Sequence, residues 1–339
     1  MSNVRTVSTG TEMEQPFISV VIPARNAEGI IGECLESLKG LDYPKDRMEI
    51  IVADGLSADR TREISESHGA RVIRNQKIRV VSARNVGFEA AQGELIALSD
   101  ADCVMEKNWL KNCVKYFQDE TVAGVGGPNL VPRGESSFGK AVGLIFDYAF
   151  FVSGAAPTMV FDRVIESRAF GSNAVYRADV LRKVMPVDES MIEGEDVAMN
   201  RLIEDLGYRL LYVPDVIVYH SRRSTPKRWW RQMHNYGLGR VLLHRKGIET
   251  LKPAHVAAGL TIPILLAICA VLVAINPWFL LYALGAAFVL AILSGIFALL
   301  QTKSWGVALN MPIALTIFLL AWSCGFLHEF VMPATKFEC

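Results

Sequence analysis

Gly93-Glu-Leu-Ile-Ala-Leu-Ser-Asp-Ala-Asp102 is the segment that decides the fold of this chain. Its apolar residues predict a buried strand, and Asp100 and Asp102 follow at the carboxyl end of that strand. In open α/β sheets, ligands bind beyond the carboxyl ends of the strands. Two carboxylates at that place can hold Mg²⁺ or Mn²⁺ together with a phosphate. The tripeptide alone is a weak signal, because Asp-x-Asp also occurs in ordinary solvated turns.

Strand-like and helix-like segments alternate around this motif. Short apolar runs bounded by Pro, Gly or Asp predict strands, and apolar residues spaced three or four apart predict helices. This alternation predicts an α/β fold with a mostly parallel sheet. Asp54, like Asp100, ends an apolar strand. The predicted strands are 17–23, 48–54, 71–74 and 94–100, and the predicted helices are 29–38, 60–68 and 84–91.

Two further polar sites follow in the chain. Glu193-Gly-Glu-Asp196 precedes a helical pattern, so these acids could simply favour the helix N-terminus. His220 ends the apolar run that begins at Tyr212, and a lone histidine at such a place is more often structural than a ligand. Neither site identifies a chemistry by itself.

Charge is distributed unevenly along the 339 residues. Lys and Arg number 35, as do Asp and Glu, so the net charge is zero and nothing favours nucleic acid as a partner. From Pro253 onward the charged residues are only Lys303, Glu329, Lys336 and Glu338. This split excludes a fully soluble protein, a disordered chain and a many-span transporter. It predicts a soluble domain joined to a short membrane region.

Three apolar runs of spanning length make up the membrane region, at 254–275, 277–300 and 305–330. Three spans are expected, with two spans plus an interfacial helix as the main alternative and buried core helices as another. The basic stretch 222–252 and Lys303 flank the spans. The positive-inside rule then predicts a cell-membrane protein with a cytoplasmic large domain, and a C-terminus across the membrane if there are three spans.

The segment 226–252 combines arginines with Trp229, Trp230, Met233 and Tyr236. We expect an amphipathic helix at the membrane interface, with a basic surface linker as the alternative. Residues 1–16 form a polar tail without the apolar core of a signal peptide. The six cysteines lack a C-x-x-C pair, so we expect reduced thiols and neither a disulfide framework nor a zinc site.

Taken together, these segments resemble the family 2 glycosyltransferases, which have the GT-A fold. The resemblance covers about Phe17 to Arg240 and divides the chain into a tail (1–16), a catalytic domain (17–225), an interfacial region (226–252) and a membrane region (253–339). The motifs that carry it are Ile18-Ser-Val-Val-Ile-Pro-Ala-Arg-Asn26, Val52-Ala-Asp-Gly-Leu-Ser-Ala-Asp59, Ala83-Arg-Asn-Val-Gly87, Gly93 to Asp102, Gly171 to Leu181, Gly194-Glu-Asp196 and Val213 to His220.

The resemblance implies roles for individual residues. Asp102 and His220 are expected to hold Mn²⁺ or Mg²⁺, and Asp196, beside Glu195, to act as the catalytic base. Asp54 is expected to contact the nucleobase, Asp100 the ribose or the metal shell, and Arg84 a phosphate. The other expected nucleotide-sugar contacts are Pro23, Arg25, Glu28 and Ala101, and the expected acceptor-side residues are Gly171, Ser172, Asn173, Gln232 and Tyr236.

Two departures from the family pattern limit these expectations. Family members often carry an acid directly after the Asn of the first motif, whereas here Ala27 follows Asn26 and the acid is Glu28. Gln232-Met-His-Asn-Tyr236 only loosely resembles the QxxRW motif of processive synthases. The chain is therefore more similar to nonprocessive, succinoglycan-type membrane enzymes.

The resemblance implies an inverting transfer from a nucleoside-diphosphate sugar, UDP-linked, to a hydroxyl of a lipid-linked saccharide. Two alternatives stay open. One is a synthase that transfers sugar directly to polyprenyl or dolichyl phosphate. The other is a catalytically inactive, membrane-anchored scaffold that only binds the sugar nucleotide.

Overall fold

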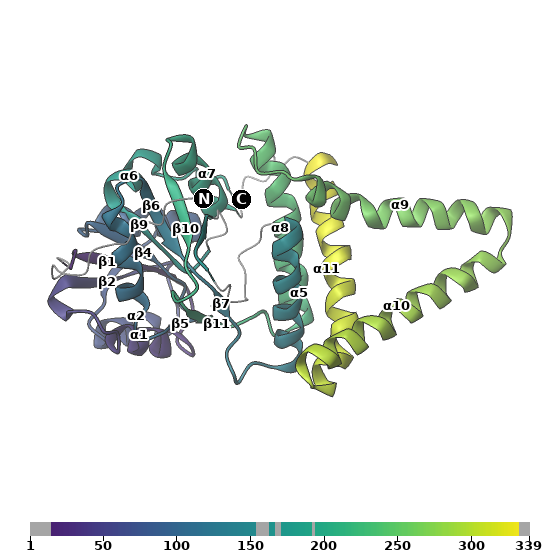
Figure 1. Cartoon of the computed structure of the whole chain (residues 1–339), viewed down its shortest axis with the longest axis horizontal. Helices are drawn as coiled ribbons and strands as arrows, with labels where there is room; N and C mark the ends of the chain where they lie inside the picture. The colour runs from purple at the N-terminus through teal and green to yellow at the C-terminus, as the bar shows by residue number, and fades with distance from the viewer. Residues whose placement is uncertain (1–14, 154–162, 167–170, 192–193, 332–339) are drawn as a thin grey trace, which may run out of the picture.

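The computed structural model describes residues 15–153, 163–166, 171–191 and 194–331. Figure 1 shows an α/β part and a helical part, with a long helical hairpin projecting from the latter. Nearly all of the predicted N-terminal tail lies outside the described residues.

The central sheet has eight strands in the order β3-β2-β1-β4-β9-β6-β10-β8. Strands β3, β2, β1 and β4 are parallel, β6 and β10 are parallel, and β9 runs antiparallel between β4 and β6. The mostly parallel sheet predicted from the sequence is confirmed. The strands are β1 (Ile18–Ala24), β2 (Met48–Asp54), β3 (Arg71–Arg74), β4 (Leu95–Leu98), β6 (Val122–Gly126), β8 (Ile165–Glu166), β9 (Ala174–Arg177) and β10 (Arg209–Tyr212).

A smaller sheet lies at the carboxyl end of the parallel strands and consists of β5 (Cys103–Met105), β11 (Val218–His220) and β7 (Asn129–Leu130). Strands β5 and β11 are antiparallel, and His220 pairs with Cys103. This register brings His220 beside Asp102, although the two residues are far apart in the sequence.

Helices cover both faces of the central sheet, and successive side chains of β1 are buried on opposite faces. Ile22 packs in the cluster with helix α1 (Ile31–Lys39), while Val21 packs in the cluster with α3 (Val80–Ala90). Helix α3 approaches β1 closely at Gly87, where a Cβ would stand 2.3 Å from Val21 Cγ1. Helix α3 also begins four residues earlier than predicted. The remaining helices of this part are η1 (Lys45–Arg47), α2 (Thr61–Ser67), α4 (Trp109–Val114), η2 (Lys115–Gln118), α6 (Ala178–Val184) and α7 (Glu195–Asp205).

The helical part begins with three helices that pack side by side, α5 (Ser137–Ser153), α8 (Pro226–Arg245) and α11 (Trp305–Val331). Trp229 of α8 is fully buried, and its indole N–H donates a hydrogen bond to the carbonyl of Ala314 at 2.9 Å. The amphipathic helix predicted for this region thus does not offer Trp229 and Met233 to a membrane, because α5 and α11 cover them. Trp230 is exposed.

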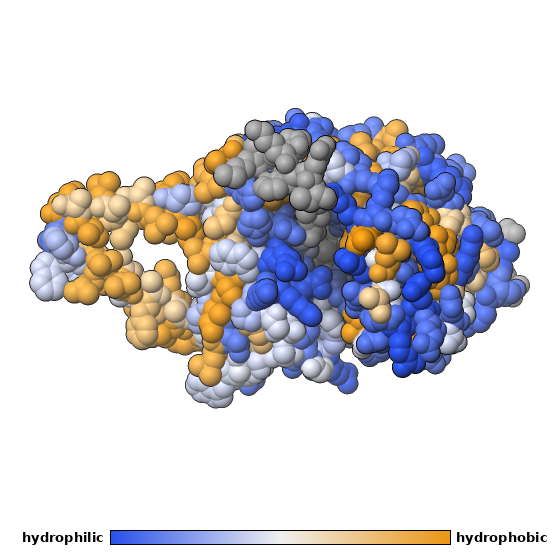
Figure 2. Space-filling view, turned by 180° about the vertical axis from the view of Figure 1, so that it is seen from behind, coloured by the Kyte–Doolittle hydropathy of each residue, from blue (hydrophilic) through white to orange (hydrophobic). Residues whose placement is uncertain are grey.

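The projecting hairpin consists of α9 (Pro253–Ile275) and α10 (Trp278–Thr302). With α11 these are three helices long and apolar enough to cross a membrane. Only 6% of the most apolar window of α9 and of α10 is buried, against 39% in α11. Figure 2 shows apolar side chains over the hairpin and mainly hydrophilic ones over the α/β part.

Candidate active site

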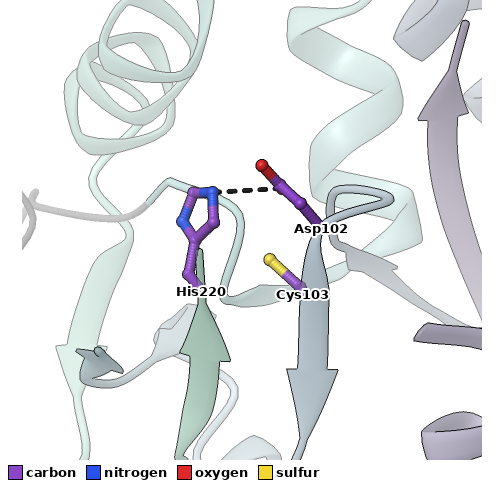
Figure 3. A group of neighbouring side chains, drawn as sticks. All are labelled: Asp102, Cys103 and His220. Atoms are coloured by element: carbon purple, nitrogen blue, oxygen red, sulfur yellow. Dashed lines mark ion pairs between the residues drawn. The ribbon is translucent and has the colours of Figure 1, made fainter. Parts of the chain in front are cut away.

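Asp102 and His220 form the centre of the first polar cluster (Figure 3). Asp102 Oδ1 lies 3.2 Å from His220 Nε2, and with Cys103 Sγ the ligand atoms lie within 4.8 Å of one another. Burial alone would raise the pKa of Asp102, but the positive charge and hydrogen bond of His220, with Arg223, lower it to about 2. This carboxylate is therefore ionised throughout the physiological range.

Ser172 orients the histidine from its other side. Its hydroxyl lies 3.1 Å from His220 Nδ1, so Nε2 faces Asp102. A second hydrogen bond on a ligating imidazole fixes the ring and its tautomer. Ser172 was predicted only as a residue lining the acceptor side, and no sequence pattern indicated this contact.

The donor set fits a hard divalent cation. Carboxylate oxygens and an imidazole nitrogen suit Mn²⁺ or Mg²⁺, with the remaining positions open to phosphate oxygens and water. Cys103 is fully buried, and burial followed by the nearby Asp100 and Asp102 charges raises the pKa of its thiol. Hard cations prefer oxygen and nitrogen ligands to a soft sulfur ligand, so Asp102 and His220 are the residues that would hold the metal.

Asp196 belongs to a second polar cluster, at the N-terminus of α7. Burial and the adjacent Glu195 carboxylate raise the pKa of Asp196 to about 6, with Arg84 opposing this shift. A carboxylate with this pKa is well placed to accept a proton near neutral pH. Gly171 borders it, since a Cβ on that glycine would stand 3.8 Å from Asp196 Oδ2.

Arg84 joins the two clusters by an ion pair to each side. Its guanidinium contacts Glu195, and its Nη2 lies 3.3 Å from Asp100 Oδ1. Burial opposes the charged form, but Glu195, Asp100 and Asp196 together raise the pKa of Arg84. In this structure the buried guanidinium pairs with the protein's own carboxylates, and its predicted phosphate contact stays a prediction. Glu195 is likewise occupied, which leaves Asp196 as the candidate base.

Asn173 is not an acceptor-side residue in this structure. Its side-chain amide donates to the carbonyls of Pro128 and Val216 at 3.1 and 2.8 Å, and its oxygen accepts from Trp109 Nε1 at 2.8 Å. The side chain is almost fully buried. It holds the strands beneath the site together, which corrects its predicted role.

The loops after β1 and β2 are bound together by several hydrogen bonds. Glu28 accepts from the N–H of Arg60 at 3.0 Å, and the N–H of Ala27 donates to Thr61 Oγ1 at 2.7 Å. Asp54 is fully buried and accepts from the N–H of Ser57, so its predicted nucleobase contact requires this turn to open. Arg25 is exposed beside Gly55.

Two other predicted positions border these loops. Pro23 is partly exposed near the carboxyl end of β1, where it pairs with Ala53 of β2. Ala101 lies buried between the two acids of the Asp-x-Asp motif. The predicted nucleotide-sugar contacts thus gather beyond the ends of β1, β2 and β4, and their roles stay predictions.

Helix α8 borders the Asp196 cluster. Gln232 donates to the hydroxyl of Tyr236 at 3.3 Å, and Tyr236 lies beside Phe146 of α5. Arg240 is partly buried, and burial lowers its pKa although the nearby Asp196 opposes this shift. At Gly194 a Cβ would stand 3.0 Å from Leu243 Cδ1, so α7 and α8 meet at this point.

Three arginines at this site were not among the predicted residues. Arg223 Nη1 lies 3.3 Å from Asp102 Oδ2, and Arg222 is held against the ring of Phe146, with its centroid 5.3 Å away. Arg240 belongs to the same group through its proximity to Asp196. The basic pair directly after His220 was a signal for the first two, whereas nothing in the sequence placed Arg240 near Asp196.

The mostly parallel sheet, with Asp102 and Asp196 beyond the carboxyl ends of its strands, has the GT-A fold of glycosyltransferases. Residues 19–185 match the family described as Glycosyl transferase family 2, so the chain carries a domain of that family.

Similar proteins agree with this assignment. A dolichyl N-acetyl-alpha-D-glucosaminyl phosphate 3-beta-D-2,3-diacetamido-2,3-dideoxy-beta-D-glucuronosyltransferase from Methanococcus voltae is 27% identical over 68% of this chain and 75% of its own length. Glycosyltransferase AglE from Haloferax volcanii is 29% identical over 61% of this chain and 68% of its own. The mannosyltransferase PcManGT from Pyrobaculum calidifontis, solved with GDP-Man and Mn²⁺, shares the fold with a TM-score of 0.65 at 21% identity, over 94% of this chain and 88% of that one.

Proposed function

We propose that this enzyme transfers a sugar, with inversion, from a nucleoside-diphosphate sugar to a hydroxyl of a lipid-linked saccharide. The observation that carries the proposal is the position of Asp196, a carboxylate with a raised pKa that lies where α7 meets α8. Helix α8 packs against α11, one of the three apolar helices. The base therefore borders the part of the molecule where a lipid-anchored acceptor would be presented. The Methanococcus voltae relative is named for such a dolichyl-linked acceptor.

The donor binds, in this proposal, beyond the ends of β1, β2 and β4. The loops after β1 and β2 and the exposed Arg25 offer backbone and charged groups to the nucleotide. Asp100 is paired with Arg84, and its side chain is 28% exposed. In this proposal it faces the ribose or the metal shell. The proposed nucleotide is uridine diphosphate, the expectation that follows from the family resemblance.

Asp102 and His220 would hold Mn²⁺ or Mg²⁺ against the donor diphosphate, in an orientation that Ser172 fixes. When bound, the cation stabilises negative charge that develops on the leaving diphosphate. Arg223 pairs with Asp102 in this structure, and its partly exposed side chain could also turn toward a phosphate.

The transfer itself needs one proton acceptor. Asp196 takes the proton of the acceptor hydroxyl while that oxygen attacks the anomeric carbon. The bond from this carbon to the diphosphate oxygen breaks, and its electron pair leaves with the nucleoside diphosphate. One displacement of this kind inverts the configuration at the anomeric carbon.

A base is required only when the acceptor is a hydroxyl, which favours the saccharide over polyprenyl phosphate. A phosphate is already ionised at neutral pH and could attack without Asp196. If the enzyme were a polyprenyl-phosphate synthase, Asp196 would not be needed as a base, and its raised pKa would serve no purpose in the reaction. An inactive scaffold would bind the donor without releasing nucleoside diphosphate.

The catalytic domain at 17–225 is proposed to lie on the cytoplasmic side, since Lys252 and Lys303 flank the apolar helices α9 and α10 at their domain-proximal ends. The region 226–252 then connects it to the membrane region at 253–339.

The test is nucleoside-diphosphate release by the purified full-length enzyme. UDP-, GDP- and dTDP-sugars are offered with and without Mn²⁺, and with either dolichyl phosphate or a dolichyl-linked N-acetylglucosamine. Metal-dependent release that increases with the lipid-linked saccharide supports the proposal. Equal stimulation by dolichyl phosphate favours the synthase, and the absence of release from every donor favours the scaffold.

A further inference from the structure

Helix α11 is apolar on two opposite faces. Val307, Ala314 and Ala321 are buried against the protein, whereas Trp305, Leu309 and Ile313 are 72%, 72% and 51% exposed. The exposed residues recur every four positions, so they share one face that runs along the helix. Cys324 and Val331 continue this face toward the C-terminus. A stripe of this kind needs a nonaqueous partner.

Helix α11 also crosses the bases of the projecting hairpin instead of running along it (Figure 1). Near its C-terminus it meets the start of α9, where Trp322 Nε1 donates to the carbonyl of His255 at 3.3 Å and Ser323 Oγ to that of Ala258 at 3.1 Å. Near its N-terminus it meets the end of α10, where a Cβ on Gly295 would stand 3.0 Å from the carbonyl oxygen of Ala308. The two contacts are about 14 residues, or roughly 20 Å, apart along α11.

Helix α8 lies against α11 over most of the length of α8. Trp229, near the start of α8, donates its hydrogen bond to the carbonyl of Ala314. Gly237 approaches the backbone of Trp322. Near the end of α8, Arg245 Nη1 lies 3.4 Å from Glu329 Oε1. The glycines allow this approach, since a Cβ on Gly325 would stand 1.9 Å from the carbonyl oxygen of His234. The two helices therefore run side by side in the same direction and occupy the same depth relative to any membrane.

This pairing decides between the possible membrane arrangements. If α11 crossed the bilayer, α8 would have to enter the bilayer with it. Arg231, Arg240 and Arg245 of α8 would then lie at membrane depth, and Asp196, which senses the charge of Arg240, would be drawn in as well. Charged side chains in the hydrocarbon core are costly, so this arrangement is excluded.

We propose that α9 and α10 cross the bilayer as a hairpin, and that α11 lies in the plane of the near leaflet with its exposed apolar face toward the acyl chains. The partner of this face is the lipid bilayer. The end of α11 at Val331 then lies on the same side as the catalytic domain. This arrangement replaces the three spans expected from hydropathy.

The dimensions and flanking residues of the hairpin support this arrangement. Beyond their contacts with α11, α9 and α10 each continue for about 16 residues, roughly 24 Å. An in-plane helix sinks about 5–10 Å below the headgroups, so together they approach the roughly 30 Å of a bilayer core. Lys252 and Lys303 mark the near side, while Asn276-Pro277 at the tip carries no charge and is followed by Trp278 and Tyr282, 65% and 68% exposed. Aromatic side chains of this kind favour the opposite interface.

The first test is cysteine labelling of the full-length protein in spheroplasts of a bacterial host. Cys269 and Cys324 are replaced by alanine, whereas Cys34, Cys103 and Cys113 are buried and stay. A membrane-impermeant maleimide is applied before or after lysis. Asn276→Cys should react in intact spheroplasts, while native Cys339 and the near-side control Lys303→Cys should react only after lysis. Reaction of Cys339 in intact spheroplasts, or of Asn276→Cys only after lysis, would overturn the proposal.

A second test measures depth directly in phospholipid vesicles. Nitroxide labels at Leu309→Cys, Ile313→Cys and Leu320→Cys should all report the same shallow depth from their relative exposure to oxygen and a water-soluble nickel chelate. Labels at Leu281→Cys, Phe288→Cys and Leu293→Cys on α10 serve as the matched control and should report depths that change along the helix. Depths along α11 that vary as they do along α10 would show a span and refute the in-plane position.

Discussion

Asp102 and Asp196 lie at the same end of the protein, and their surroundings move their pKa values in opposite directions. Asp102 faces His220 and Arg223, and its pKa falls to about 2. Asp196 is buried beside Glu195, and its pKa rises to about 6. Burial disfavours the charged form at both places, so the charge of the neighbours decides the difference. Two residues of the same type can thus take different tasks, one as a permanent anion and one as a proton acceptor.

The largest effect is expected from removing the permanent anion. Asp102→Asn should lower metal-dependent turnover by about a thousandfold, because a bound cation contributes several kcal/mol to the stability of the transition state. Turnover at saturating Mn²⁺ measures this. Asp42→Asn, which removes an exposed acid paired with Lys111, is the control and should leave turnover unchanged. Near-normal turnover of Asp102→Asn would remove Asp102 from the metal site.

Removing the proton acceptor should have the next largest effect. Asp196→Asn should lower transfer to a saccharide acceptor by about a hundredfold or more. In the native enzyme, turnover should fall as the pH falls through about 6, since the protonated carboxyl cannot accept a proton. The variant should lose this acid limb. Asp205→Asn, at the other end of α7 and half exposed, is the matched control. An unchanged pH profile in Asp196→Asn would contradict its role as base.

A smaller effect is expected from the residue that orients the histidine. Ser172→Ala should weaken Mn²⁺ binding by about tenfold, because the ring of His220 loses its second hydrogen bond. Calorimetric titration of Mn²⁺ into the full-length protein with a donor nucleotide measures the change. Ser99→Ala tests the loss of a buried hydroxyl one residue before Asp100, since within the described residues that hydroxyl has no hydrogen-bond partner. Equal losses of Mn²⁺ affinity in the two variants would show that Ser172 does not support the metal site through its hydrogen bond to His220.

The smallest effect is a shift in the pH profile without loss of the base. Glu195→Gln removes the negative neighbour of Asp196 and should move the acid limb to lower pH. Arg84→Gln removes the positive neighbour and should move it to higher pH. Both variants break the same ion pair, so each controls for the structural effect of the other. Shifts in the same direction would show that charge at Arg84 and Glu195 does not set the pKa of Asp196.

The parts of the fold that were predictable depend on local patterns. Apolar runs that end in Asp54 and Asp100 identified both strands, β2 and β4, and placed the two acids at the carboxyl end of the sheet. The Arg84–Glu195 ion pair was not predictable, because its partners lie more than a hundred residues apart and only the packing of α3 against α7 brings them together. Asn173 was misassigned for the same reason, since its partners at Pro128 and Val216 belong to other loops.

Helix α11 shows where hydropathy alone is insufficient. Its composition resembles that of α9 and α10, yet 39% of its most apolar window is buried against 6% in each of the others. The distinguishing residues are small ones, such as Gly325 and Ala314, which allow α8 and the Trp229 side chain to approach. A count of apolar residues does not show where small residues allow another helix to approach.

The contact between α7 and α8 at Gly194 and Leu243, together with the packing of α8 on α11, ties Asp196 to the membrane region without a flexible linker. A catalytic carboxylate held in this way would stay at a constant distance from the membrane surface. With the lipid-linked acceptor proposed above, it would reach hydroxyls at one distance from the lipid phosphate. The enzyme would then select acceptors by the length of the glycan on the lipid, without contacting the sugars that precede the reacting one.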